Sequence, residues 1–208
     1  MKTIYLVRHG ETDANLKGYV PGKEEPLNTT GFVQADLLAQ RVTQLDFDVI
    51  VASDFLRAQQ TVKPISTVKN ASVQTVSSFG EMFEPTSIHG LNDDDEDVIS
   101  YRKNRNANIE SHEWRQEDGE NFLDLFERIT EAKKFLEISE ANNLLIVSHS
   151  FFLQMFVATI LLGAQQPTKD WFNIGLTLKM SNTGITFLTE DSGHWRVVTW
   201  NDHAHFAE

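Results

Sequence analysis

The fold is decided by Thr3-Ile4-Tyr5-Leu6-Val7 and the polar residues that follow it directly, Arg8-His9-Gly10. A run of apolar and β-branched residues indicates a short buried strand, and the change to polar residues indicates a loop. The same order returns downstream, where Leu144 to Val147 runs into Ser148-His149-Ser150. Two such segments predict two buried strands, each with polar side chains at its carboxyl end.

Helical and extended segments alternate along the rest of the chain. Apolar residues recur at spacings of three and four from Thr29 or Thr30 onward and over 121–136, which predicts two helices, and an apolar helix is expected over 151–162. Ser53 and Asp54 are expected to cap a further helix that runs to about Lys63, where Pro64 would bend or interrupt it. Strands are predicted over 47–52, 73–76, 177–180, 183–188 and 195–200. This alternation predicts an α/β fold, a three-layer α/β/α sandwich around a mostly parallel sheet.

The composition indicates an acidic protein of one domain. The 208 residues carry 18 Lys and Arg against 30 Asp and Glu, which gives a formal net charge of −12, and there is no cysteine. We therefore expect a single domain over 1–208, a cytoplasmic location and no nucleic-acid partner. The longest apolar stretch, 151–162, is shorter than a bilayer-spanning helix, and the amino terminus lacks the pattern of a secretion signal, so no membrane partner is expected.

Residues 84–119 differ from the rest of the chain. They are polar, contain the acidic run 93–97 and show little sustained periodicity, which we interpret as a small insertion or lid over the strand ends. The acidic run lacks the alternating ligands and the turning glycine of a calcium loop, so we interpret it as a solvated helix start. His203 and His205 lack an evident third metal ligand and are interpreted as part of a solvated tail.

Four polar clusters lie where predicted strands end or helices begin: 8–12, 53–57, Glu81 and 148–150. In an open α/β sheet the carboxyl ends of the strands border one crevice, so these clusters are expected to share a site. Two histidines and two arginines without a cysteine indicate an anionic substrate rather than a metal ion. Guanidinium groups match the geometry of a phosphate, and an imidazole can act as a nucleophile or a donor.

Five segments carry a resemblance to a known family: LVRHGETDAN at 6–15, PLNTTGFVQA at 26–35, SDFLRAQQT at 53–61, GEN at 119–121 and IVSH at 146–149. In this order they resemble the histidine phosphatase superfamily, in its phosphoglycerate mutase-like branch. A lone Arg-His-Gly would be a weak signal, whereas five ordered segments up to about residue 150 are a strong one. The last third resembles the family only through its strand pattern and Asn182-Thr183.

The resemblance implies a role for each of the clustered residues. His9 would be the nucleophile that takes up a phosphoryl group as phosphohistidine. Arg8 and Arg57 would hold the equatorial oxygens of that group, and His149 would donate to the same oxygens. Glu81 best matches the acid/base carboxylate of the family.

Three positions beside this set remain open. Glu84 lies three residues after Glu81 and could present a carboxylate to the same pocket. Asn15 would add a neutral donor to the substrate, or it could be an ordinary cap or turn residue. Ser150 stands where glycine is usual in the family, so its side chain would either narrow the approach or add a contact to the substrate. Tyr19 and Pro21 replace a basic residue and a small polar donor of the family pattern.

The resemblance implies a phosphomonoester hydrolase that acts on a small phosphorylated metabolite and needs no metal ion and no cofactor. One alternative is a cofactor-dependent phosphoglycerate mutase, which would need a second cationic cluster; the candidates are Arg102, Lys103, Arg105 and Arg115, interspersed with acidic residues. Another alternative is a non-catalytic phosphate-binding scaffold on the same fold. The oligomeric state stays open.

Overall fold

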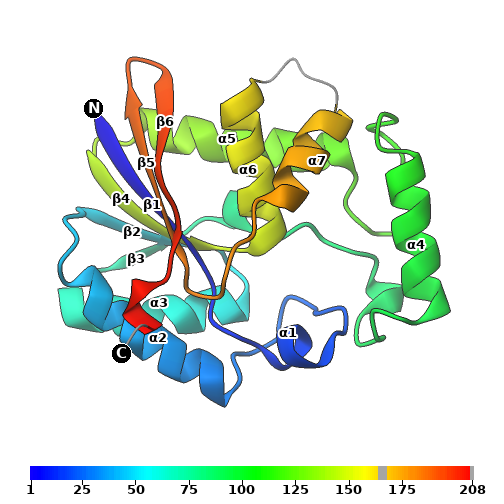
Figure 1. Cartoon of the computed structure of the whole chain (residues 1–208), viewed down its shortest axis with the longest axis horizontal. Coiled ribbons are helices and arrows are strands. Elements are labelled where there is room, and N and C mark those ends of the chain that lie inside the picture. The colour runs from blue at the N-terminus through cyan, green and yellow to red at the C-terminus, as the bar shows by residue number, and fades with distance from the viewer. Residues whose placement is uncertain (164–167, 207–208) are drawn as a thin grey trace.

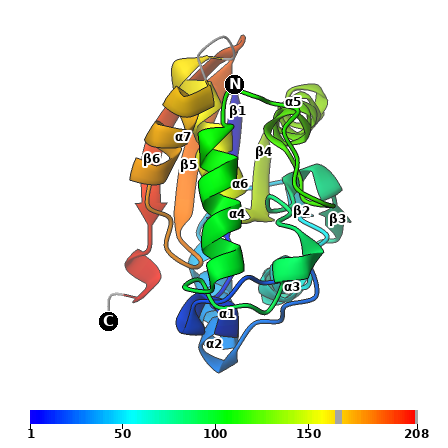
Figure 2. The ribbon, with the colours of Figure 1, turned by 90° about the vertical axis from the view of Figure 1, so that its right-hand side faces the viewer.

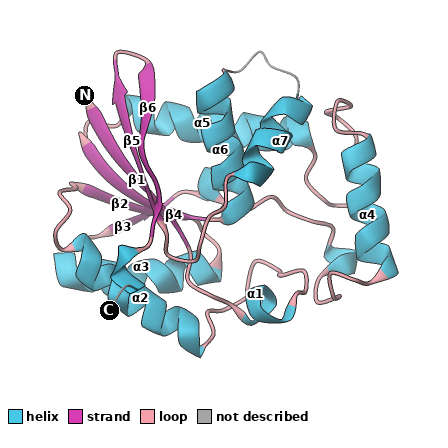
Figure 3. Cartoon of the chain, viewed as in Figure 1, coloured by secondary structure: helices cyan, strands magenta, loops and turns pink. Residues whose placement is uncertain are grey.

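The structure of the chain is a computed structural model that describes residues 1–163 and 168–206. Its centre, within these ranges, is a six-stranded sheet with the strand order β3-β2-β4-β1-β5-β6 (Figure 1). Figure 3 shows the sheet with helices on both sides. The strands are β1 (Lys2–Arg8), β2 (Val49–Ala52), β3 (Val73–Thr75), β4 (Asn143–Ser148), β5 (Ile185–Asp191) and β6 (His194–Asp202).

β1 and β4 are neighbours at the centre of the sheet and run parallel. Their register pairs Thr3 with Asn143 and continues to the pair of Arg8 with Ser148. β2 is parallel to both β4 and β3, whereas β5 and β6 are antiparallel to their neighbours. Because β1 and β4 end at the same edge of the sheet, His9 and His149 follow them into one place.

Helices cover both faces of the sheet, so the predicted three-layer sandwich is confirmed. α2 (Thr29–Val42) and α3 (Leu56–Lys69) pack on one face, and α5 (Phe122–Ile138) and α6 (Ser150–Leu162) pack on the other. Side chains alternate between the two cores along β1: Ile4 and Leu6 lie in the core under α5 and α6, and Val7 lies in the core under α2 and α3. This alternation explains why the strand is apolar at every central position.

The region 84–119 forms a separate layer beside the sheet. It contains a 3₁₀ turn (Thr86–Ile88) and α4 (Glu96–Ala107), the helix nearest the viewer in Figure 2. A small core of Val20, Ile88, Val98 and Tyr101 holds it against the loop that follows α1 (Asp13–Lys17). The acidic run begins α4, as expected, with the Asp95 carboxylate accepting from the backbone N–H of Asp97 at 3.0 Å.

Two predictions about local structure were wrong. The helix after β2 begins at Leu56 without a side-chain cap and continues through Pro64 to Lys69. Packing of Val62 and Ile65 in the core offsets the hydrogen bond that proline cannot make. The segment 177–180 is not a strand, because α7 (Thr168–Thr177) ends there in a turn. Polar and apolar side chains alternate over 177–180 as they would in a strand, which led to the wrong prediction. The sequence analysis did not predict α7.

No helix in the described part of the chain has both the length and the apolar character needed to cross a membrane.

Close backbone contacts fix the loop after β1. A Cβ on Gly10 would lie 2.7 Å from the carbonyl oxygen of Gly31, and a Cβ on Gly31 would overlap the carbonyl oxygen of Glu11. The Glu11 backbone N–H also donates to the Gln34 side chain at 2.8 Å, and Asn28 donates to the Glu11 carboxylate at 2.9 Å. The first turn of α2 therefore holds the loop that carries His9.

We expect Gly31→Ala to destabilise the protein, although replacing glycine by alanine inside a helix usually stabilises it by up to about 1 kcal/mol. The added methyl group has only backbone atoms to displace, so the expected loss is about 1–3 kcal/mol in the free energy of unfolding. Urea denaturation measures it. Gly175→Ala in α7 is the matched control, because its nearest neighbour is the flexible Met155 thioether at 3.3 Å. Equal stability of the two variants would contradict the role given to this contact.

Candidate functional site

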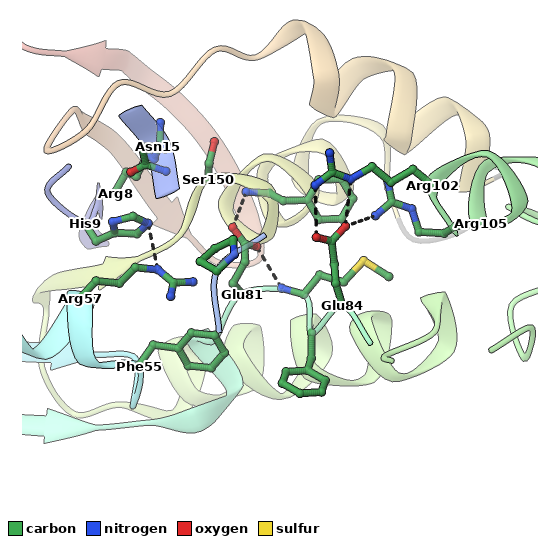
Figure 4. A pocket seen from close by; sticks show the side chains of 14 residues that line it. Arg8, His9, Asn15, Phe55, Arg57, Glu81, Glu84, Arg102, Arg105 and Ser150 are labelled. Carbon is green, nitrogen blue, oxygen red and sulfur yellow. Dashed lines mark hydrogen bonds and ion pairs between the residues drawn. The ribbon is translucent and has the colours of Figure 1, made fainter. Parts of the chain in front are cut away.

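The polar clusters meet in one pocket at the carboxyl ends of β1 and β4. The pocket has a volume of about 280 Å³. Its lining contains every predicted site residue except His149, together with further side chains that the sequence did not indicate (Figure 4). The lining residues are Arg8, His9, Asn15, Pro21, Phe55, Arg57, Glu81, Met82, Phe83, Glu84, Arg102, Arg105, Ser150 and Phe151.

The hydrogen bonds of His9 define which ring nitrogen is free to react. Nδ1 lies 2.7 Å from the carbonyl oxygen of Gly10, which only accepts, so Nδ1 carries the hydrogen. Nε2 accepts from the Nε–H of Arg57 at 3.2 Å. The lone pair of the imidazole is therefore on Nε2, on the side of the ring that faces Arg57 in Figure 4.

The surroundings of His9 keep its imidazole neutral. Burial and the positive charges of Arg57 and Arg8 hold the pKa of His9 well below its usual range. Only 4% of the residue is exposed, so solvent screens these charges poorly. A neutral imidazole keeps the lone pair that a nucleophile needs.

Two guanidinium groups are anchored by backbone carbonyl groups. Arg8 donates to Met180 O at 2.7 Å, and Arg57 donates to Gly22 O at 2.9 Å. Burial lowers the pKa of Arg57 to about 10, so the group is still a cation at neutral pH. The anchoring bonds use only part of the five donors of each guanidinium, which leaves donors for an anion in the pocket.

His149 is fully buried and lies beside His9, with the two ring centroids 5.1 Å apart. Its Nε2 lies 2.8 Å from the hydroxyl of Ser53, which already accepts from the backbone N–H of Phe55 at 3.2 Å. If the Ser53 hydroxyl donates to Nε2, the His149 hydrogen lies on Nδ1. This Nδ1 has no hydrogen-bond partner among the described residues. The expected cap of α3 is missing because Phe55, and not Ser53 or Asp54, occupies the N-cap position, and its apolar side chain cannot accept a hydrogen bond.

Glu81 closes the pocket at the N-terminus of α6. Its carboxylate accepts from the backbone N–H groups of Met82 at 3.0 Å, Phe152 at 2.8 Å and Phe151 at 3.1 Å. Burial raises the pKa of Glu81, and these hydrogen bonds and the charge of Arg57 oppose the rise without cancelling it. A carboxyl group with a raised pKa is suited to hold a proton and release it.

Glu84 lies at the other end of the pocket and is paired with cations. Arg102 donates to both of its carboxylate oxygens, and Arg105 donates to one of them. Figure 4 shows Glu81 on the side of His9 and Glu84 turned toward the two arginines. Of the two carboxylates that the sequence left open, the geometry therefore favours Glu81 as the acid/base group.

Asn15 and Ser150, the two expected substrate-binding residues, both line the pocket, and Asn15 also makes hydrogen bonds within the protein. Its amide oxygen accepts from the Thr12 backbone N–H at 3.3 Å and from Asn182 Nδ2 at 3.1 Å, which leaves its own NH₂ group for an anion. The expectation of a cap residue is thus also correct, since Asn15 completes the capping box of α1. Ser150 begins α6 at the pocket wall.

Sequence reasoning missed the part that Asn182 plays. Its side chain donates to the carbonyl oxygen of His9 at 3.0 Å and so connects the loop before β5 to the loop that carries His9. Asn182-Thr183 was noticed only as a likeness to the family, and it is the signal that could have found this contact. The tail histidines lie elsewhere: His205 contacts Thr183 at 3.0 Å, and His203 is exposed. The described residues contain no group of three or more His, Asp or Glu side chains that could hold a metal ion.

Comparison with known proteins identifies the family. The sequence model of the histidine phosphatase superfamily (branch 1) matches residues 4–203. The chain belongs to this superfamily.

Relatives of this histidine phosphatase have more than one name. The chain is 32% identical over 207 residues to a protein named probable phosphoglycerate mutase GpmB from Enterobacter sp. (strain 638), covering 96% of this chain and 90% of the relative. It is 27% identical over 165 residues to the adenosylcobalamin/alpha-ribazole phosphatase of Escherichia coli (strain K12), covering 76% and 78% of the two chains.

Solved structures share the fold. Bacillus stearothermophilus YhfR superimposes with a TM-score of 0.82 at 23% identity, over 99% of both chains. The alpha-ribazole phosphatase from Shigella flexneri gives a TM-score of 0.76 at 22% identity, over 96% of both chains. The likeness extends over the whole sandwich, so this histidine phosphatase has the overall architecture of its superfamily.

We expect the His9 ring to be neutral at pH 7 in the ligand-free protein, with a pKa well below the usual value of about 6.5. Burial and the charges of Arg57 and Arg8 oppose the cation, so the ring gains its second proton only as the pH falls. A ¹⁵N NMR titration of the ring nitrogens from pH 8 to pH 5 measures this, with His9→Gln to assign the signals. A doubly protonated ring at pH 7 would contradict the electrostatic account.

Proposed function

We propose that this histidine phosphatase hydrolyses phosphomonoesters of a small metabolite through a phosphohistidine on Nε2 of His9. The observation that carries the proposal is the neutral imidazole whose Nε2 lone pair faces the Arg57 guanidinium, in a pocket that Arg8 also lines. A phosphoryl group is bound there by cations and attacked by a base that is not itself protonated. A pocket of about 280 Å³ is at the small end of ligand sites, which favours a small substrate.

In the first step the Nε2 lone pair of His9 forms a bond to phosphorus as the ester P–O bond breaks. Arg8 and Arg57 balance the charge on the equatorial oxygens, and the Nδ1–H of His149 donates to one of them. The protonated Glu81 carboxyl gives its proton to the departing alkoxide, which would otherwise be a poor leaving group. The products of this step are the alcohol, the phosphohistidine and the Glu81 carboxylate.

In the second step water is the nucleophile. The Glu81 carboxylate takes a proton from the water as its oxygen bonds to phosphorus, and the P–N bond breaks with its electron pair returning to His9 Nε2. Inorganic phosphate leaves, and His9 is again neutral with Glu81 protonated. The raised pKa of Glu81 suits it to both halves of the cycle.

The mutase alternative finds less support in the residues of the pocket. A mutase would need a second cationic cluster for a bisphosphate, and the two arginines that reach the pocket are already paired with Glu84. Arg115 pairs with Asp124, and Lys103 is exposed on α4. The relative named a mutase keeps that alternative open to test, whereas the complete set of reacting groups opposes a non-catalytic scaffold.

We expect ³²P-labelled substrate to leave an acid-labile, base-stable label on the protein after rapid quenching. His9→Ala should abolish the label, because it removes the ring nitrogen that contacts Arg57 in the pocket. His203→Ala is the control, since this exposed histidine lies outside the pocket. Label that persists in His9→Ala would overturn the assignment.

With 3-phosphoglycerate, release of inorganic phosphate indicates the hydrolase, whereas interconversion to 2-phosphoglycerate without phosphate release would establish the mutase.

We expect Glu81→Gln to lower kcat/KM for an alkyl phosphate by about 10²–10⁴, the usual contribution of a general acid. The loss should be much smaller for p-nitrophenyl phosphate, because nitrophenolate departs without a proton. Steady-state kinetics on both esters measure the difference. Glu127→Gln is the control, since this exposed carboxylate of α5 lies outside the pocket lining. Equal losses on the two esters would contradict the role of Glu81 as the proton donor.

A further inference from the structure

An ion pair between α5 and the loop before it contacts the segment that carries Glu81. Arg128 donates to Glu120 through two bonds, from Nε to Oε1 at 2.5 Å and from Nη2 to Oε2 at 2.7 Å. The two side chains are 21% and 10% exposed. Neither residue lines the pocket of His9, and the reaction proposed above gives neither of them a role. Glu120 belongs to the GEN segment at 119–121, whose part in the site is so far unexplained.

Arg128 uses all five of its N–H donors, and three of them bind backbone carbonyl groups at or just before Glu81. Nη1 donates to Gly80 O at 2.8 Å and to Ser78 O at 3.2 Å, and Nη2 donates to Glu81 O at 3.3 Å. The other two donors bind the Glu120 carboxylate. Because the donors of a guanidinium form a rigid planar fork, these bonds fix the three carbonyl groups relative to one another.

Glu120 contacts the same segment just after Glu81. Its carboxylate accepts from the Phe83 backbone N–H at 3.2 Å, and its own backbone N–H donates to the Phe83 carbonyl at 2.7 Å. Residues 80–85 belong to neither a helix nor a strand, so their backbone groups need partners outside regular secondary structure. The ion pair supplies such partners on both sides of Glu81.

The ion pair also contacts a residue that binds the Glu81 carboxylate. The backbone N–H groups of Phe151 and Phe152, in the first turn of α6, donate to this carboxylate at 3.1 and 2.8 Å. The guanidinium of Arg128 lies 5.1 Å from the centre of the Phe152 ring. The carboxylate is thus bound by α6, while the main chain that carries it is bound by Arg128 and Glu120.

Glu120 compensates the charge that Arg128 brings close to Glu81. The charges of Arg57 and Arg8 already interact with the Glu81 carboxylate. A third, uncompensated cation would favour the ionised form of Glu81 and oppose the proton that a general acid must carry. Because Arg128 is paired with a carboxylate, it can bind the backbone of Glu81 without adding a net charge there.

We propose that Arg128 and Glu120 are positioning residues for proton transfer by Glu81. They hold the main chain of residues 78–83 where the Glu81 carboxyl group can reach the departing oxygen of the ester. This inference rests on the proposed function, in which Glu81 is the acid/base group, and it gives neither residue a contact with the substrate. Loss of the pair should slow proton transfer and leave the binding of the phosphoryl group by Arg8 and Arg57 unchanged.

The test measures kcat/KM of Arg128→Lys for glycerol 3-phosphate, an alkyl ester, and for p-nitrophenyl phosphate. Lysine keeps the charge but has three donors in place of five, so it cannot make all the bonds of Arg128. We expect kcat/KM for glycerol 3-phosphate to fall by about 10–10²-fold, since a displacement of about 1 Å can cost that much. The value for p-nitrophenyl phosphate should change little, because nitrophenolate departs without a proton.

A second measurement asks whether Arg128 acts through Glu81. In the Glu81→Gln variant, adding Arg128→Lys should cause little further loss on glycerol 3-phosphate, because the group that Arg128 positions no longer carries the proton. Effects of residues that act on one step through the same group are not additive, whereas independent effects would multiply. A merely structural role of Arg128 would lower the rate in both backgrounds.

Arg41→Lys is the matched control. Arg41 of α2 is 33% exposed, pairs with Asp202 at 3.2 Å and lies outside the pocket lining. This variant should leave kcat/KM for both esters unchanged. If Arg128→Lys does not fold, as judged by circular dichroism, Glu120→Gln provides the same test, with the same dependence on the ester expected. Its own control is Glu127→Gln on the exposed side of α5.

Three outcomes would overturn the proposal: an equal loss on both esters in Arg128→Lys, no loss on glycerol 3-phosphate, or a further loss of the same size in the Glu81→Gln background. The Glu81→Gln variant alone reports on the proposed function. If it lowers kcat/KM for both esters equally, Glu81 is not the proton donor, and the inference fails together with that role. If Glu81→Gln depends on the ester and Arg128→Lys does not, the positioning role alone is refuted.

Discussion

The site depends on one hydrogen bond between a guanidinium cation and a histidine side chain. Arg57 donates from Nε to Nε2 of His9, and this bond exists only while the imidazole is neutral. The carbonyl of Gly10 holds the His9 hydrogen on Nδ1, and burial together with the neighbouring charges opposes protonation of Nε2. The same contact therefore selects the tautomer, excludes the imidazolium and places a guanidinium where a phosphoryl group would be transferred.

Much of the surrounding structure holds this pair in place. The Gly10 backbone N–H donates to Thr61 at 2.9 Å, and the Thr61 hydroxyl donates to the carbonyl of Arg57 at 2.7 Å. These bonds connect the loop after β1 to the first turns of α3. Gly31 brings α2 against the same loop from another side. The loop that carries His9 is thus held by two helices that pack on the same face of the sheet.

The carboxylate comes from the opposite half of the molecule. Glu81 caps α6 through backbone N–H groups, and such a position normally favours the charged form of a carboxyl group. Burial outweighs this effect and raises its pKa. The pocket thus places a neutral base and a carboxyl of raised pKa between cations. It concentrates positive charge in a chain that is acidic as a whole, so an anion is attracted by the local field and not by the net charge.

The sequence alone determined the layered fold and indicated which residues gather in the pocket. Buried strands appear in the sequence as short apolar runs. Polar motifs follow β1 and β4 directly, so the sequence places His9 and His149 at the same edge of the sheet. Tertiary structure decided the matters that depend on distant partners. These are which of Glu81 and Glu84 lies on the side of His9, the contact of Ser53 with His149, the tolerance of Pro64 inside a helix, and the position of Arg105 in the pocket lining. Local patterns encode backbone preference and burial, whereas the partner of a polar side chain is set by the packing of segments far apart in the chain. No spacing in the sequence contains that information.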